Sequence, residues 1–228
     1  MRALSAGLEN LGRRAAGRYG RIADEAGELA LLAARAVRSL ATPPWETRVW
    51  LAQMEQIGVR SFGVAAITTV FTGMVLALQT ALALPGLGVK YYIGTVVSKS
   101  TVRELVPVLV ALIVGGRIGS GMTAEIGTMK VTEQVDALRA MAADPVRKLV
   151  VPKLAAALVM LPALTLIGDA LGVLGGLVIA VLQLQLTAAF YWNDVVTALT
   201  LEDFGSGLGK SVFFAFFITI VACHNGLT

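Results

Sequence analysis

The feature that most limits how this chain can fold is an uncharged run between Arg60 and Lys90. This run exceeds the roughly 20 apolar residues that a helix needs to cross the hydrocarbon of a bilayer. Across the whole chain, 56% of the residues are hydrophobic and only 15% are charged, whereas about a quarter of the residues of a soluble domain are charged. We therefore predict an all-α integral membrane protein with a single membrane domain over residues 1–228.

Further apolar tracts bring the predicted number of transmembrane helices to four. In the second tract only Leu105 to Gly116 is uncharged, so this span must include Arg103 and Glu104 to reach across the bilayer. The third tract predicts one long helix, with a hairpin at Gly168-Asp169 as the alternative. Its glycines at 168, 172, 175 and 176 have the spacing that allows close helix packing. The expected segments are an interfacial helix at 1–44, an elbow and first span at 45–84, a second span at 95–119, a third at 146–186 and a fourth at 206–225.

Arg103 and Glu104 would lie in the outer half of the membrane. Ionisable residues at that depth cost about 3 kcal/mol each, so they usually face a partner, water or a cavity. In the simpler alternative, Arg103 reaches the outer headgroups and Glu104 pairs with it. Pro107 follows within one helical turn and would free backbone carbonyls near the same point. Asp169, in the third span, has no assigned role, structural or functional.

The distribution of basic residues predicts the orientation. Nine of the nineteen Lys and Arg lie in residues 1–60 and six more in 117–153. Basic residues are retained on the cytoplasmic side, so both regions and both termini are expected there. Residues 187–205 carry acids and no base, which is typical of an external loop.

Two segments have the pattern of amphipathic surface helices. In the first, 1–44, apolar residues recur at helical spacing among arginines, which favours a position in the cytoplasmic interface. The second lies in the polar insert RIGSGMTAEIGTMKVTEQVDALRAMAADP, between the second and third spans. There we predict a helix over 122–143, downstream of the helix-breaking Gly119 and Gly121. Tied to a span at each end, it could transmit a push from a soluble partner, or simply rest at the headgroup level.

Several kinds of chemistry are not expected. One cysteine and one histidine exclude a disulfide framework and a His/Cys metal cluster within one chain. GSGLGKS at 205–211 has three residues between its glycines where a P-loop needs four. We therefore expect no catalytic or metal site, no nucleic-acid partner and no ATP hydrolysis by this chain. Ion coupling through Glu104 or Asp169 is a further possibility, although the repeats common in secondary transporters are not evident.

The chain resembles the MlaE/YrbE family, the permease subunits of ABC-type lipid transporters that work with MCE proteins. The resemblance rests on TGMVLALQ at 72–79, RELVPVLVALIVGGRIGSGMTAEIGTMKVTEQVDAL at 103–138, the DP at 144–145 and the following LVVPKLAA. Val106 departs from the glycine usual in the family. The family also continues with a glycine-rich loop and a fifth span beyond this point.

The resemblance implies a homodimeric permease of the bacterial inner membrane that moves phospholipids between the inner and outer membranes and maintains outer-membrane lipid asymmetry. It implies a cytoplasmic ABC ATPase that binds ATP and Mg, a STAS-domain protein and a periplasmic MCE-domain hexamer as partners, with no cofactor in this chain. The rival hypotheses are a membrane scaffold that recruits soluble partners and an ion-coupled carrier of hydrophobic molecules.

The resemblance also assigns roles to individual residues. Those expected to contact the ATPase from the 122–143 helix are Glu125, Thr128, Lys130, Glu133, Asp136 and Arg139. Those expected to line or gate a lipid cavity between protomers are Arg103, Glu104, Leu105, Leu76, Thr80, Ala83, Leu84 and Leu87.

Overall fold

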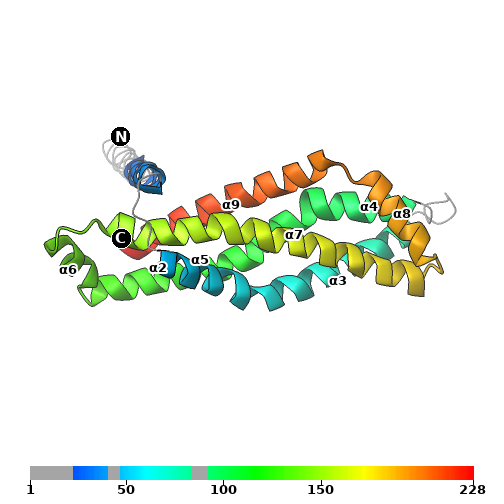
Figure 1. The fold of residues 1–228 in the computed structure, drawn as a ribbon, viewed down its shortest axis with the longest axis horizontal. Coiled ribbons are helices and arrows are strands. Elements are labelled where there is room, and N and C mark those ends of the chain that lie inside the picture. Colours follow the sequence, from blue (N-terminus) through cyan, green and yellow to red (C-terminus); the bar gives the residue numbers. More distant parts are fainter. Residues whose placement is uncertain (1–22, 41–46, 84–91) are drawn as a thin grey trace, which may run out of the picture.

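A computed structural model describes residues 23–40, 47–83 and 92–228. These form a bundle of long helices (Figure 1), of which four are long and apolar enough to cross a membrane: Thr47–Leu82, Ile93–Val131, Val146–Leu182 and Leu201–Leu227. The prediction of four spans is therefore confirmed for the described part of the chain. The elements are a helix at 23–40, α2 (Thr47–Met54), α3 (Arg60–Ala83), α4 (Ile93–Ser100), α5 (Val106–Val131), α6 (Gln134–Ala140), α7 (Val151–Leu182), α8 (Ala188–Ala198) and α9 (Leu201–Leu227).

Short π-helical turns join some of these helices end to end, so that each span is continuous. They are η1 (Glu55–Val59) between α2 and α3, η3 (Thr101–Leu105) between α4 and α5, and η4 (Val146–Val150) before α7. At one end of the bundle lies α6, and at the other lie α4 and α8 (Figure 1). We call these the α6 end and the α8 end.

Small residues bring the helices together. The most extensive contacts join α3 to α7 and α5 to α9, and α7 also packs against α9. A Cβ atom placed on Gly73 would lie 1.8 Å from the carbonyl oxygen of Gly172, and one on Gly175 would lie 2.2 Å from that of Val70. Only glycine allows two helix backbones to approach this closely. The predicted close packing of the 168–176 glycines is thus confirmed.

The third span is one helix rather than a hairpin. Helix α7 continues through Pro162, Gly168 and Asp169 without a turn. The apolar environment explains this, because a turn at that depth would leave backbone groups without hydrogen-bond partners. The span ends a few residues before the predicted limit at 186, and most of the predicted external loop at 187–205 is occupied by α8 and the first turn of α9.

The prediction of one helix over 122–143 is wrong. Helix α5 continues past Gly119 and Gly121 to Val131, and the chain then turns at Glu133, whose φ of 58° is left-handed. Glycines weaken a helix by about 1 kcal/mol each, which tertiary packing overrides. Here the packing is with α9, because Gly119 contacts Ile218. Only Gln134–Ala140 forms the separate helix α6.

The N-terminal helix packs on the α6 end of the bundle (Figure 1). Its buried residues Leu32 and Ala36 join a cluster with Ile126 of α5, Leu154 of α7 and Ile220 of α9. The rest of its described surface is largely exposed and carries its charges, as the amphipathic pattern predicts. Residues 1–22 and 41–44 of the predicted interfacial helix lie outside the described residues.

The α8 end is held together by specific polar contacts. The carboxylate of Asp194 on α8 accepts hydrogen bonds from the backbone N–H and the hydroxyl of Thr95 on α4, at 2.8 and 2.5 Å. The buried hydroxyl of Tyr191 donates to the carbonyl of Val173 on α7 at 3.0 Å. Burial and the nearby negative charge of Asp194 raise the pKa of the Tyr191 phenol, so it remains a protonated donor.

Candidate functional site

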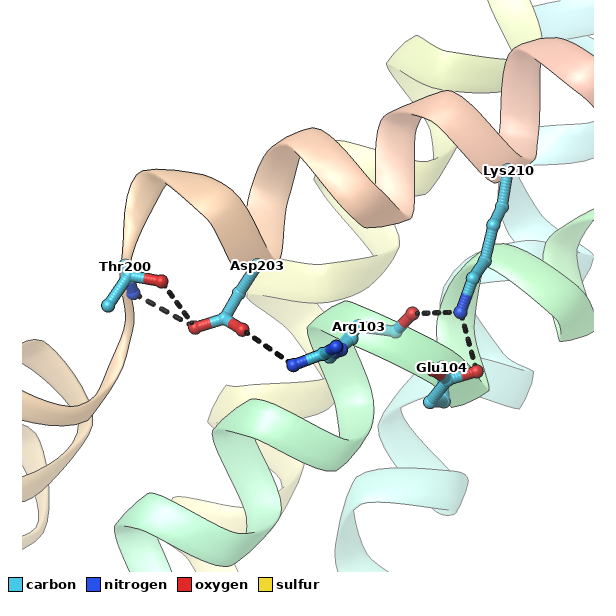
Figure 2. Close-up of polar contacts among 5 residues, drawn as sticks. All are labelled: Arg103, Glu104, Thr200, Asp203 and Lys210. Atoms are coloured by element: carbon cyan, nitrogen blue, oxygen red, sulfur yellow. Dashed lines mark hydrogen bonds and ion pairs between the residues drawn. The ribbon is translucent and has the colours of Figure 1, made fainter.

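A cluster of charged residues joins the second and fourth spans near the α8 end (Figure 2). The Glu104 carboxylate and the Lys210 ammonium are 2.6 Å apart, and Arg103 Nη1 lies 3.8 Å from Asp203 Oδ1. Asp203 also accepts hydrogen bonds from the backbone N–H and hydroxyl of Thr200, at 3.1 and 2.9 Å, which caps the start of α9. The cluster therefore consists of two ion pairs, each joining η3 to α9.

Pro107 explains why Lys210 has a second contact in this cluster. Proline has no N–H, so the carbonyl of Arg103, four residues earlier, cannot accept the usual α-helical hydrogen bond. The Lys210 ammonium donates to this carbonyl instead, at 3.0 Å. The carbonyl that Pro107 was predicted to free thus forms part of the cluster.

The alternative in which Glu104 pairs with Arg103 is wrong, because each of the two residues pairs with α9. Sequence reasoning did not select Lys210 and Asp203 as site residues. A signal was available: these opposite charges are seven residues apart, two helical turns, on a helix that otherwise carries few charges. Two adjacent charges on another span could meet both of them.

An apolar groove begins one turn below the Glu104–Lys210 pair. It has a volume of about 560 Å³ and lies between α5 and α9, which both run from the α8 end to the α6 end. Val108 follows Glu104 by four residues, and Phe214 follows Lys210 by four, so each lies on the same helix face as the charge before it. The groove continues along the glycine-rich face of α5, past Gly115. The arrangement is amphipathic, with an exposed ion pair at the head of an apolar channel.

The other predicted cavity residues belong to a different part of the bundle. Leu76 packs in a cluster with α4, α7 and α8, and the Thr80 hydroxyl donates to the carbonyl of Leu76 at 2.7 Å. Helix α3 packs mainly against α7, whereas η3 packs against α9. Leu105, the last residue of η3, is half-buried. Leu84 and Leu87 lie outside the described residues, as does the side chain of Ala83.

The predicted ATPase contacts divide into two groups. The first is turned toward the bundle: Glu125 Oε2 lies 2.6 Å from the buried ammonium of Lys153 on α7, which also donates to Gln53 of α2 at 3.4 Å. Lys130 donates to the carbonyl of Thr228 at the end of α9. Glu125 therefore joins α5 to α7 near the α6 end, while 41% of its side chain remains exposed.

The second group is exposed at the α6 end. Glu133 forms the left-handed turn before α6, and Asp136 and Arg139 on α6 form an ion pair at 3.0 Å with both side chains largely exposed. Thr128, also exposed, donates its hydroxyl to the carbonyl of Ala124 at 2.8 Å. These side chains are exposed and therefore accessible to a soluble partner.

The four apolar helices and the amphipathic groove define a multi-pass α-helical membrane protein. Comparison with known proteins identifies the family of membrane proteins to which the chain belongs. Residues 50–228 match the sequence model of the family described as permease MlaE, and the chain belongs to this family.

Three relatives have informative names. A probable ABC transporter permease protein of Rickettsia typhi is 42% identical over 206 residues, which are 90% of this chain and 80% of the relative. One of Synechocystis is 43% identical over 178 residues, or 78% and 68% of the two chains. The intermembrane phospholipid transport system permease protein MlaE of Haemophilus influenzae is 37% identical over 175 residues, or 76% and 67%.

The chain is therefore an ABC transporter permease. Permeases of this class are not themselves ATPases, and they work with an ATPase partner.

Proposed function

We propose that this permease moves phospholipids between the inner and outer membranes of a bacterium. The observation that carries the proposal is the exposed Glu104–Lys210 pair at the head of the groove between α5 and α9. A lipid site needs mostly apolar walls with a few polar groups at one end for the headgroup. The name of the Haemophilus influenzae relative supports the same substrate.

The proposed assembly combines the partners that the family resemblance implies with the positions of the α6 end and the α8 end of the bundle. Two copies pair in the inner membrane with their N-termini in the cytoplasm, so that the α6 end faces an ABC ATPase that binds ATP and Mg. The exposed Glu133, Asp136 and Arg139 dock on this ATPase. A STAS-domain protein bound to the ATPase and a periplasmic MCE-domain hexamer complete the transporter, which maintains outer-membrane lipid asymmetry.

The lipid site is tested by charge variants in the reconstituted transporter. Glu104→Lys should lower ATP-dependent phospholipid transfer by about tenfold, the effect of losing one charge-assisted contact of about 1.4 kcal/mol. The swap Glu104→Lys with Lys210→Glu restores an ion pair and separates two roles. If Glu104 contacts the headgroup, lipid transfer by the double variant should remain low. Full recovery of transfer would instead mean that the ion pair only holds η3 to α9. Glu202→Lys, an exposed charge change on the first turn of α9, serves as the control.

The coupling role is tested with Asp136→Lys. This change should reduce both ATPase binding and lipid-stimulated ATP hydrolysis, because it reverses a charge on an exposed docking surface. Co-purification with the ATPase measures the first effect. Unchanged lipid transfer after confirmed loss of ATPase binding would eliminate the permease mechanism and favour the scaffold.

One observation favours a second candidate, an ion-coupled carrier. Asp169 in α7 is buried, and its Oδ1 has no hydrogen-bond partner among the described residues. Buried carboxylates within spans are common ion relays. This candidate requires transport without the ATPase and its loss in Asp169→Asn, whereas the ABC mechanism requires transport that stops without ATP.

A further inference from the structure

A second cavity lies at the α6 end, far from the Glu104–Lys210 pair. Its volume is about 680 Å³, which is within the range of about 300–1,000 Å³ typical of ligand pockets. Its walls come from four parts of the chain: the end of the N-terminal helix at Ser39 and Leu40, Trp50 of α2, the connection after α6 at 142–144, and the start of the third span. It shares no residue with the groove between α5 and α9.

The lining of this cavity is ordered along the third span. Arg147 and Lys148 line the cavity from η4, where the third span begins. The next turns of α7 present apolar residues at helical spacing. These apolar residues are Val151, Pro152, Ala155, Leu158 and Val159. Positive charge thus lies toward the end of the span, and an apolar surface extends from it into the bundle.

The third charged residue of the wall, Asp144, caps the start of the third span. One carboxylate oxygen of Asp144 accepts the backbone N–H of Val146 at 3.0 Å. With two bases and one acid the lining has a net charge of +1. The site is therefore suited to an anion that carries a hydrocarbon chain.

Trp50 has a buried polar group without a partner among the described residues. Its indole N–H is buried, and no described residue accepts a hydrogen bond from it. A buried donor without an acceptor costs about 1–3 kcal/mol, so such groups call for a ligand or water. Trp50 also lines the cavity, although its N–H is itself closed off from the open space, so Trp50 serves as a reporter beside the site.

We infer that this cavity binds one anionic phospholipid of the cytoplasmic leaflet. The headgroup lies against Arg147 and Lys148, and an acyl chain follows the apolar face of α7 beside Trp50. Basic pockets at the cytoplasmic ends of spans bind anionic headgroups in this way. The inference rests on the proposed orientation of the α6 end and not on transport.

Quenching of tryptophan fluorescence tests the site directly. Trp45→Phe with Trp192→Phe leaves Trp50 as the reporter in the full chain. The protein is placed in phosphatidylcholine vesicles that contain equal small fractions of brominated phosphatidylglycerol or brominated phosphatidylcholine. We expect the brominated anionic lipid to reach Trp50 with about tenfold higher apparent affinity, equivalent to about 1.4 kcal/mol. Equal quenching by the two lipids would overturn the inference.

Three controls make the result specific. Arg147→Gln with Lys148→Gln should abolish the preference, whereas Arg139→Gln, a basic residue at the same end but outside the cavity, should retain it. A reporter with only Trp192, which is exposed on α8, should be quenched equally by both lipids. Loss of the preference in Arg139→Gln, or its survival in the double variant, would attribute it to general surface charge and refute the site.

Because these measurements use neither ATP nor the ATPase, their failure is distinguishable from failure of the proposed function. A preference in the Trp50 reporter without any lipid transfer would leave the site intact and refute only the transporter. Lipid transfer without any preference at Trp50 would refute the site and leave the proposed transporter intact.

Discussion

The ion pair between Glu125 and Lys153 predicts that removing its two partners has unequal effects. Only 3% of the Lys153 side chain is exposed, against 41% of that of Glu125. In Glu125→Leu the ammonium stays buried, with only the Gln53 contact at 3.4 Å remaining among the described residues. In Lys153→Met the carboxylate can instead turn to water, and the methionine fills most of the space that the lysine stem occupied.

The magnitudes follow from the exposure of the group left behind. Breaking a buried pair costs about 3–5 kcal/mol when an uncompensated charge remains inside. We expect about 3 kcal/mol for Glu125→Leu, because Gln53 still provides one weak contact. For Lys153→Met we expect about 1 kcal/mol, the net value of a typical hydrogen bond. The difference of about 2 kcal/mol is roughly a thirtyfold difference in the folded-to-unfolded ratio.

Unfolding by sodium dodecyl sulfate in mixed micelles, followed by tryptophan fluorescence, measures these free energies. The double variant should be close to Lys153→Met, because removing both charges leaves no buried ion. The exposed pair of Asp136 and Arg139 provides the matched control: Asp136→Leu should cost no more than about 0.5 kcal/mol. A larger loss in Lys153→Met than in Glu125→Leu would refute the argument from burial.

Three further changes test the packing and polar contacts of the bundle by the same unfolding measurement. Gly73→Ala should destabilise by about 3 kcal/mol, because the new Cβ would clash with the backbone of α7, while Gly63→Ala, with nothing within 4 Å, should be neutral or stabilise by up to about 1 kcal/mol. A neutral Gly73→Ala would show that α3 and α7 do not approach as described. Tyr191→Phe should cost about 1 kcal/mol for its lost buried hydrogen bond, and no loss would mean that the hydroxyl is satisfied otherwise. Asp194→Ala, which removes both contacts to Thr95, should cost about 1–2 kcal/mol; an unchanged free energy of unfolding would contradict it.

The number of spans and the continuity of α7 could be predicted from the sequence because both depend on the length of apolar tracts. A tract between charges either reaches across the hydrocarbon or does not, and this can be counted. The glycines at 172 and 175 could likewise be assigned to packing from their spacing alone. These features are local, so no knowledge of the partner helix is needed.

The partners of Arg103 and Glu104 could not be predicted, because they lie about a hundred residues away on α9. Which spans are neighbours depends on how all the helices pack together, and a charge pattern on one helix does not contain this information. The same limit applies to Glu125: the polar insert alone could not show that this exposed side chain pairs with Lys153 of α7. The end of α5 was also misplaced, because glycine propensity was given more weight than packing against α9.

The second span is held to its neighbours by charged residues at both of its ends, and the contacts at the α8 end are easier to separate than those at the α6 end. Near the α8 end, Arg103 and Glu104 are exposed and Lys210 partly so, whereas Asp203 is buried but keeps its two hydrogen bonds from Thr200 when Arg103 leaves. Exposed pairs contribute at most about 1 kcal/mol, so they can open at little cost. Near the α6 end, separating Glu125 from Lys153 would leave the buried ammonium of Lys153 without its ion-pair partner, at a cost of about 3 kcal/mol. A force applied at α6 would therefore move α5 and α7 together at the α6 end, and the first contacts to yield would be those between η3 and α9 at the head of the groove.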